Sequence, residues 1–138
     1  MIDEILQIEP YSLKSSEKDE LFLKSVMQAL QYHYNNCSEY KQYCMKKKFD
    51  PFSSCSLESI PYLPVGIFKK LNLLSVPENE IVRTVKSSST TGNQPSVIHL
   101  DQTTINRQIL ALNSIMRSFL GTNKLDFLII DNSATIKT

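Results

Sequence analysis

Residues Val85–Ser96 read VKSSSTTGNQPS, a run of small hydroxyl side chains that leads into a glycine and a proline. The preceding residues Glu80–Val85 and the following residues Ser96–Leu100 alternate apolar and polar side chains and are rich in β-branched residues. This pattern is typical of half-buried strands. The sequence therefore predicts a strand, a hydroxyl-rich loop and a second strand, and the rest of the chain is organised around that unit.

The composition of this loop suits phosphate groups. Its hydroxyls can donate hydrogen bonds to phosphate oxygens, and Gly92 lets the backbone approach a ligand closely. The loop is not a Walker A motif, because G-x-x-x-x-G-K-[ST] is absent. Clusters of this kind also form ordinary solvated turns, so the loop alone leaves both interpretations open. The candidate phosphate-binding residues are Ser88, Ser89, Thr90, Thr91 and Gly92.

A long helix is predicted directly after the second strand. Asp101 can cap a helix that runs from Gln102 to about Leu120, and Gly121 can end it. Apolar side chains recur on one face of this helix at helical spacing, so that face is expected to pack in the core. They are Ile105, Ile109, Leu112, Met116 and Phe119.

Residues Leu125–Ile130 are almost continuously apolar, which is typical of a strand covered on both faces. A strand, a helix and a strand of these lengths predict a right-handed crossover and a parallel pair. Asp131 ends the apolar run. It either faces a ligand or a magnesium ion at the sheet edge or makes a hydrogen-bonded turn. The predicted class is α/β.

The first 60 residues are expected to be helical. A short helix over Ile2–Ile8 precedes a long one over Glu17–Asn36 with Ser16 as its cap, and Ser38 is a candidate cap for a third helix. One stripe of the long helix is expected to be buried, with His33 packed in it as a structural residue. The stripe comprises Phe22, Val26, Ala29, Leu30, His33 and Cys37.

The three cysteines, Cys37, Cys44 and Cys55, lack C-x-x-C spacing and form an odd set. Neither a disulfide framework nor a zinc site is indicated, and free thiols in or near the core are expected. Tyr40 and Tyr43 are expected to pack with their hydroxyls in water.

At 138 residues, with 41% hydrophobic residues and a formal net charge of +1, the chain is expected to form a single domain. The near-neutral charge gives no reason to expect nucleic acid as a partner, and the one basic run, Lys46–Lys48, suits the end of a helix. No apolar segment approaches the length needed to cross a bilayer, so a cytoplasmic protein is expected.

The loop resembles the phosphate loop of the adenylate-forming ligases. The segment Ile60–Lys70 is similar to that family's Pro-x-x-x-Phe-Lys approach segment, and Leu125–Asp131 resembles the strand after the loop's helix. The similarity is greatest to the acyl-protein synthetases of the LuxE type, with phenylacetate-CoA ligases as more distant relatives. The sequence departs from that pattern at Ser89, where relatives commonly have glycine, and at Ser96, where many have lysine.

This resemblance implies an incomplete piece of a ligase N-terminal domain, with a helical part over residues 1–60 and an α/β part over residues 61–138. It implies ATP-dependent activation of a carboxylic, fatty acid as an acyl-adenylate, transfer of the acyl group to a protein thiol or CoA, and Mg²⁺ bound with the nucleotide. Ser88, Ser89, Thr90, Thr91 and Gly92 would contact the phosphates. No residue is assigned a catalytic role and no metal ligand is assigned.

The chain alone is expected not to turn over. Two alternatives stay open: a non-catalytic α/β fragment that associates with itself through an open sheet edge, and a fragment of a phenylacetate-CoA ligase-like enzyme.

Overall fold

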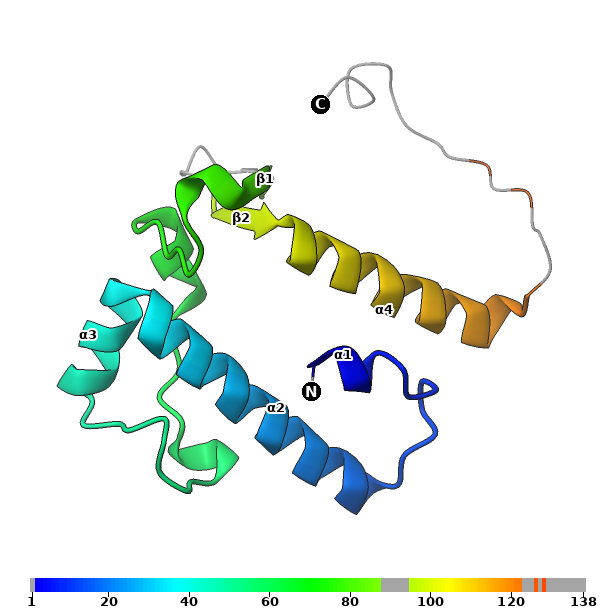
Figure 1. Ribbon diagram of the computed structural model, residues 1–138, viewed down its shortest axis with the longest axis horizontal. Helices are drawn as coiled ribbons and strands as arrows, with labels where there is room; N and C mark the ends of the chain where they lie inside the picture. The colour runs from blue at the N-terminus through cyan, green and yellow to red at the C-terminus, as the bar shows by residue number, and fades with distance from the viewer. Residues whose placement is uncertain (1, 88–94, 123–125, 127, 129–138) are drawn as a thin grey trace.

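The computed structural model describes residues 2–87, 95–122, 126 and 128, and it is a mixed α/β structure (Figure 1). Three helices come first, followed by three 3₁₀ turns, a two-stranded antiparallel sheet and a fourth helix. The elements are α1 (Ile2–Ile5), α2 (Ser15–Asn36), α3 (Ser38–Lys46), η1 (Leu57–Ser59), η2 (Val65–Lys69), η3 (Glu78–Glu80), β1 (Ile81–Lys86), β2 (Val97–Asp101) and α4 (Gln102–Leu120).

The N-cap residues of α2 and α3 both precede the residues that were predicted. The N-cap of α2 is Lys14, whose backbone N–H donates to the Glu17 carboxylate over 3.1 Å, so Ser16 lies inside the helix. Cys37 ends α2 and is also the N-cap of α3, which makes Ser38 the first residue of α3. A single residue therefore separates the two helices, and the chain turns a sharp corner there (Figure 1).

The cluster of buried hydrophobic residues lies at this corner. Cys37, Tyr40 and Cys44 are buried, and partly buried side chains from α2, α3 and the following loops pack around them. Those side chains are Leu30, Tyr34, Tyr43, Phe49, Leu63 and Leu73. Two of the three cysteines are therefore core residues, as predicted, whereas Cys55 is only partly buried.

The buried stripe predicted for α2 is confirmed only toward its C-terminal end. Cys37 is buried and Leu30 packs on the core, but Phe22 is 57% exposed. His33 is also more exposed than predicted. The exposure of Phe22 has a geometric reason, because the N-terminal half of α2 projects away from the corner with α3 (Figure 1).

The predicted bounds of α4 are confirmed. Asp101 is its N-cap and accepts a hydrogen bond from the Thr104 backbone N–H over 2.8 Å. Gly121 ends the helix with a φ of 76°, in the left-handed region that favours glycine.

The prediction that the apolar face of α4 is buried was wrong for most of its residues. Ile109, Leu112 and Phe119 are 50%, 59% and 72% exposed, and Met116 is 38% exposed. The segment that follows α1 instead contacts α4 on the side of Ala111 and Ile115. Helical periodicity identified the apolar stripe but could not identify which side of the helix another segment would cover.

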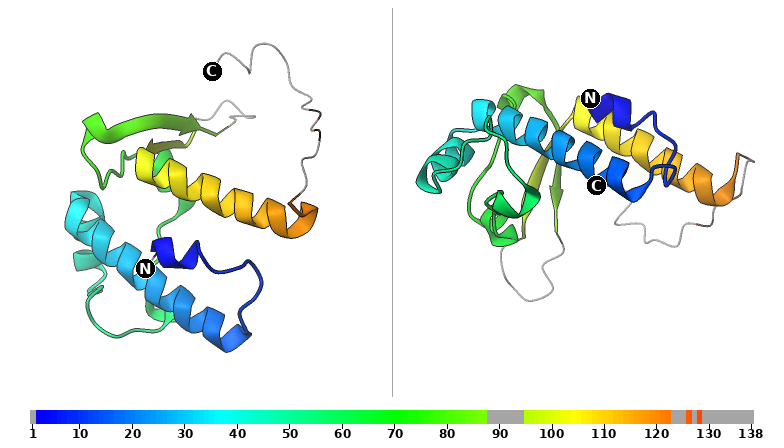
Figure 2. Two further views of the ribbon diagram at one scale, coloured as in Figure 1. Left: turned by 45° about the vertical axis from the view of Figure 1, so that its right-hand side comes forward. Right: turned by 90° about the horizontal axis from the view of Figure 1, so that it is seen from below.

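The N-terminal segment lies between α2 and α4 in the left view of Figure 2. None of the helices among the described residues has both the length and the hydropathy of a membrane-spanning segment. The predicted strand Leu125–Ile130 and Asp131 lie outside the described residues, apart from Asp126 and Leu128, so the predicted parallel crossover stays a prediction.

Candidate functional site

The hydroxyl-rich segment connects the two strands of an antiparallel hairpin. Thr84 pairs with His99, Val85 with Ile98, and Lys86 with Val97, and the register shifts between Ile81 and Arg83. The prediction of a strand on each side of the loop is therefore confirmed. β1 is more exposed than the predicted half-buried strand, because only its first residue is partly buried.

Ser87 and Ser96 close the hairpin just beyond its last strand pair. The Ser87 backbone N–H donates to the Ser96 carbonyl over 3.0 Å, and the Ser96 backbone N–H donates to the Ser87 hydroxyl oxygen over 2.9 Å. These two hydrogen bonds hold both ends of the connecting segment within one hydrogen-bonded ring. Ser96, where many resembled ligases have lysine, thus contributes its backbone to the base of the loop.

The five predicted phosphate-binding residues, Ser88 through Gly92, lie outside the described residues. Their assignment to phosphate stays a prediction from the sequence, in which four hydroxyl side chains precede a glycine. Lys86 lies in the last strand pair before this segment and is exposed. It directly precedes the hydroxyl run in the sequence, and the strand register pairs it with Val97.

A histidine bridge connects the hairpin to the chain that precedes it. His99 Nε2 lies 2.9 Å from Asn72 Oδ1, and His99 Nδ1 lies 3.0 Å from Thr84 Oγ1. Because Asn72 Oδ1 can only accept, Nε2 carries a hydrogen, and in the neutral ring Nδ1 accepts from the Thr84 hydroxyl. Sequence reasoning missed this bridge, although the register that pairs Thr84 with His99 brings the two side chains together.

The segment Ile60–Lys70 approaches the sheet as the 3₁₀ turn η2, which contacts β2. Phe68 is partly buried, as predicted, and Lys69 and Lys70 are exposed. None of these residues has a described contact that would give it a chemical role. Structural support of the hairpin is the function that their positions favour.

His33 lies apart from the hairpin, near the corner between α2 and α3. Its Nδ1 is 2.7 Å from Ser75 Oγ, and its ring packs edge-on against Tyr40 with ring centroids 6.4 Å apart. Loss of surrounding water lowers the pKa of His33 below its ordinary value. His33 thus has a hydrogen-bond partner 42 positions away in the sequence, which fits the predicted structural role.

The hydroxyls of Tyr40 and Tyr43 differ in their hydrogen bonding. The Tyr43 hydroxyl donates to the Tyr62 carbonyl over 2.6 Å. The Tyr40 hydroxyl is buried and has no hydrogen-bond partner among the described residues. The prediction of a hydrated hydroxyl was therefore wrong for Tyr40.

The described residues thus define a mixed α/β protein with helices packed beside a hairpin that carries a hydroxyl-rich loop. The family model described as "Acyl-protein synthetase, LuxE" matches residues 1–136. With all but two residues matched, the chain belongs to the LuxE acyl-protein synthetase family.

Three relatives are each named a long-chain-fatty-acid–luciferin-component ligase. The chain is 34% identical to the one from Photorhabdus luminescens over 95 residues, which cover 69% of this chain and 81% of that protein. It is 31% identical to the Vibrio harveyi protein over 75% of this chain and 27% of the relative. It is 30% identical to the Aliivibrio fischeri protein over 83% of this chain and 30% of the relative.

The aligned part of the chain therefore spans less than a third of the Vibrio and Aliivibrio relatives. No solved structure matches the chain.

Proposed function

We propose that this chain is part of an ATP-dependent ligase that activates a long-chain fatty acid as an acyl-adenylate and passes the acyl group to a thiol. Membership of the LuxE family and the names of the three relatives support the reaction class and the acid. The observation that carries the proposal is the pair of hydrogen bonds between Ser87 and Ser96. These bonds hold the two ends of the hydroxyl-rich segment together beside the ends of β1 and β2.

The proposed reaction has two steps. A carboxylate oxygen of the acid attacks the α-phosphorus of ATP, and the bond to the β-phosphate oxygen breaks, which releases pyrophosphate. A thiolate then attacks the acyl carbon of the adenylate, and AMP leaves as a thioester forms. Neither step requires a nucleophile from the loop.

The loop would stabilise negative charge on the β- and γ-phosphates. Hydroxyl and backbone donors held in advance at the position of developing charge lower the barrier to phosphoryl chemistry. Ser88, Ser89, Thr90 and Thr91 would supply the hydroxyls, and Gly92 would allow close approach of the backbone. Mg²⁺, coordinated mainly by the nucleotide, would neutralise part of the phosphate charge.

Neither buried cysteine of this chain suits the role of the acceptor thiol. Cys37 and Cys44 are 3% and 0% exposed, and burial raises the pKa of the Cys44 thiol. A buried thiol with a raised pKa forms little thiolate and is inaccessible to an acyl-adenylate. The Cys55 thiol is partly buried and lies 3.2 Å from the Met27 sulfur.

Calorimetric titration of the purified chain with Mg·ATP tests the phosphate loop. Gly92→Val, which adds a branched side chain where close approach is required, is expected to abolish binding. Gly66→Val is the matched control, because a Cβ at Gly66 meets no atom within 4 Å, and it is expected to bind like the wild type. Equal binding by both variants, or no binding by folded wild-type protein, would refute the role of the loop.

Turnover is a separate test. We expect no AMP formation when the chain is incubated with ATP, Mg²⁺ and a fatty acid, because neither buried cysteine can accept an acyl group and no residue of the chain is assigned a catalytic role. Acid-dependent AMP formation by the isolated 138 residues would contradict this.

A second candidate is a non-catalytic module that associates with itself through the hairpin. The observation in its favour is the exposure of apolar side chains on both strands, since Val82, Val85 and Ile98 are 58%, 42% and 49% exposed. Exposed strands are templates for pairing with another chain. Light scattering distinguishes the two candidates, because this module would be an oligomer that persists on dilution and binds no nucleotide.

A further inference from the structure

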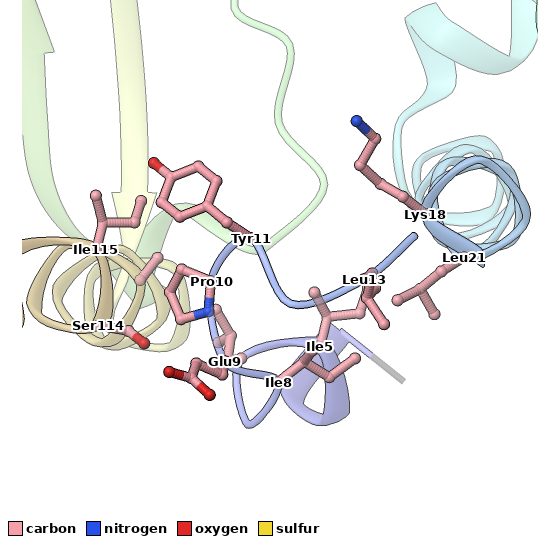
Figure 3. Close-up of a pocket in the computed structure, with 12 residues that line it drawn as sticks. Ile5, Ile8, Glu9, Pro10, Tyr11, Leu13, Lys18, Leu21, Ser114 and Ile115 are labelled. Atoms are coloured by element: carbon pink, nitrogen blue, oxygen red, sulfur yellow. The ribbon is translucent and has the colours of Figure 1, made fainter. Parts of the chain in front are cut away.

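A cavity lies between the N-terminal segment, the first turns of α2 and the middle of α4 (Figure 3). Its volume is about 260 Å³, and most of its lining is aliphatic. Ile5 and Ile8 line it from the N-terminal segment, Leu21 from α2, and Ala111 and Ile115 from α4. Three separate parts of the chain thus supply one apolar surface.

Two specific contacts hold the N-terminal segment, which forms one wall of this cavity from Ile5 to Leu13, against α4. Arg107 binds the Asp3 carboxylate through two parallel hydrogen bonds, from Nε to Oδ1 and from Nη2 to Oδ2, each 2.8 Å long. The Tyr11 and Phe119 rings pack edge to face with centroids 5.7 Å apart. Bidentate arginine–carboxylate pairs fix orientation as well as distance, so the wall has a defined position.

The backbone of the wall is also locally constrained. Tyr11 has a φ of 67°, in the left-handed region that bulky residues rarely adopt. The segment reaches this conformation directly after Pro10, another lining residue. A proline followed by a left-handed residue makes the chain bend around the cavity instead of crossing it.

The charged groups of the lining are Lys18 and Glu9, and they lie apart. In Figure 3 the Lys18 ammonium and the Tyr11 hydroxyl extend to the same side of the cavity, whereas the Glu9 carboxylate extends to the opposite side. Among the described residues, the ion pair found is between Arg107 and Asp3, and no carboxylate pairs with Lys18. One side of the apolar cavity therefore has a cation without a described partner.

We propose that this cavity is a binding site for a long-chain carboxylate, with part of the acyl chain among the aliphatic side chains and the carboxylate beside Lys18. Burial of methylene groups supplies affinity, and the ammonium selects an anionic head group. The cavity is smaller than most small-molecule sites, at roughly 300–1,000 Å³, so it holds a segment of the chain and leaves the remainder outside.

The choice of a fatty acid as ligand rests on the proposed function, but the site is separate from the phosphate loop. Its lining comes from residues 5–21 and 111–115, whereas the hairpin base is at Ser87 and Ser96. Since it shares no residue with the candidate phosphate loop, the site would act as a reservoir or entry site for the fatty acid. Binding there requires no ATP.

Calorimetric titration without nucleotide tests the site with two ligands that share a tail, dodecanoate and dodecyltrimethylammonium, each below its micelle concentration. Saturable binding of dodecanoate and much weaker binding of the cation are expected. Lys18→Gln should weaken dodecanoate binding roughly threefold to fivefold, the size expected for a partly exposed ion pair. Lys24→Gln, an exposed lysine of the same helix outside the lining, should leave it unchanged.

Ala111→Leu fills the cavity and should remove most of the binding. Because overpacking can also disturb the fold, a nitroxide-labelled stearate provides an independent readout on the wild type. It should broaden the NMR methyl signals of Ile8, Leu21 and Ile115 before those of the exposed Leu112. Equal affinity for the two head groups, no effect of Lys18→Gln, or broadening that begins at Leu112 would each overturn the proposal.

The phosphate loop can be judged separately from this site. Gly92→Val is expected to leave dodecanoate binding unchanged, and Lys18→Gln is expected to leave Mg·ATP binding unchanged. Absence of Mg·ATP binding by the folded wild type, with dodecanoate binding present, would refute the proposed function and retain the cavity site. Absence of dodecanoate binding by the wild type, with Mg·ATP binding present, would do the reverse.

Discussion

Tyr40 and Tyr43 are neighbours on α3 whose hydroxyls have opposite energetic effects. Their rings stack with centroids 6.4 Å apart, but the Tyr43 hydroxyl has a partner and the Tyr40 hydroxyl has none among the described residues. A buried hydroxyl without a partner loses its hydration and gains nothing in return. We expect Tyr40→Phe to raise the free energy of unfolding by about 1 kcal/mol and Tyr43→Phe to lower it by about 1 kcal/mol.

Urea denaturation measures both changes, and each variant serves as the control for the other. Burial, and secondarily the adjacent Cys44 thiol, raises the pKa of Tyr40 well above its usual range, which agrees with a hydroxyl removed from water. If Tyr40→Phe destabilised the protein as much as Tyr43→Phe, the Tyr40 hydroxyl would have a stabilising partner after all.

His33 should make stability depend on pH. Its pKa is lowered in the folded state, so between the ordinary value of 6.5 and the lowered value the unfolded chain binds a proton that the folded chain does not. The free energy of unfolding should therefore fall as the pH falls below about 6.5. Chemical denaturation between about pH 7.5 and 5.5 should show this decline in the wild type and a smaller one in His33→Gln. Identical pH profiles would contradict it.

At the scale of single elements, α4 begins at a cap that can be removed without touching any packed side chain. Asp101 accepts from the Thr104 backbone N–H, and the Thr104 hydroxyl and backbone N–H lower the pKa of Asp101. We expect Asp101→Ala to lower the free energy of unfolding by about 1 kcal/mol, whereas Asp101→Asn, which keeps the acceptor oxygen, should be close to the wild type. Thermal unfolding followed by circular dichroism measures both. Equal losses would show that the carboxylate's charge, and not its capping geometry, stabilises α4.

The elements that sequence reasoning predicted well are those defined by local signals. α4 was predicted to the residue because a capping aspartate, helical periodicity and a terminal glycine all occur within its own segment. The hairpin was predicted as two strands around a loop, but the pairing register of the strands was not predicted. Because the register was unknown, the bridge from Thr84 through His99 to Asn72 was missed. That bridge depends on residues brought together from separate segments. Local periodicity carries no information about such contacts.

At the scale of the whole molecule, long-range contacts determine which apolar surfaces are covered. Asp3 and Arg107 are 104 positions apart, yet they pair, and the N-terminal segment lies on one side of α4 with the cavity between them. The sequence shows an apolar stripe on α4, and this pairing leaves most of that stripe exposed. For the candidate phosphate loop, the sequence of residues 88–92 indicates the chemistry. Those residues lie outside the described part of the chain, so their geometry stays a prediction.

The exposed apolar stripe of α4 should cause the chain to self-associate. Leu112 and Phe119 are 59% and 72% exposed on the same helix as Ile109 and Met116, and apolar patches of this kind are seldom left free in soluble monomers. We expect concentration-dependent association by analytical ultracentrifugation, and binding of an apolar dye. Leu112→Glu should reduce both, because a charge in the stripe is costly to bury. Asn113→Glu, the neighbouring exposed position off the stripe, adds the same charge and should leave both unchanged. If the two variants reduced association equally, net charge would be the cause, and the helix face would have no specific role.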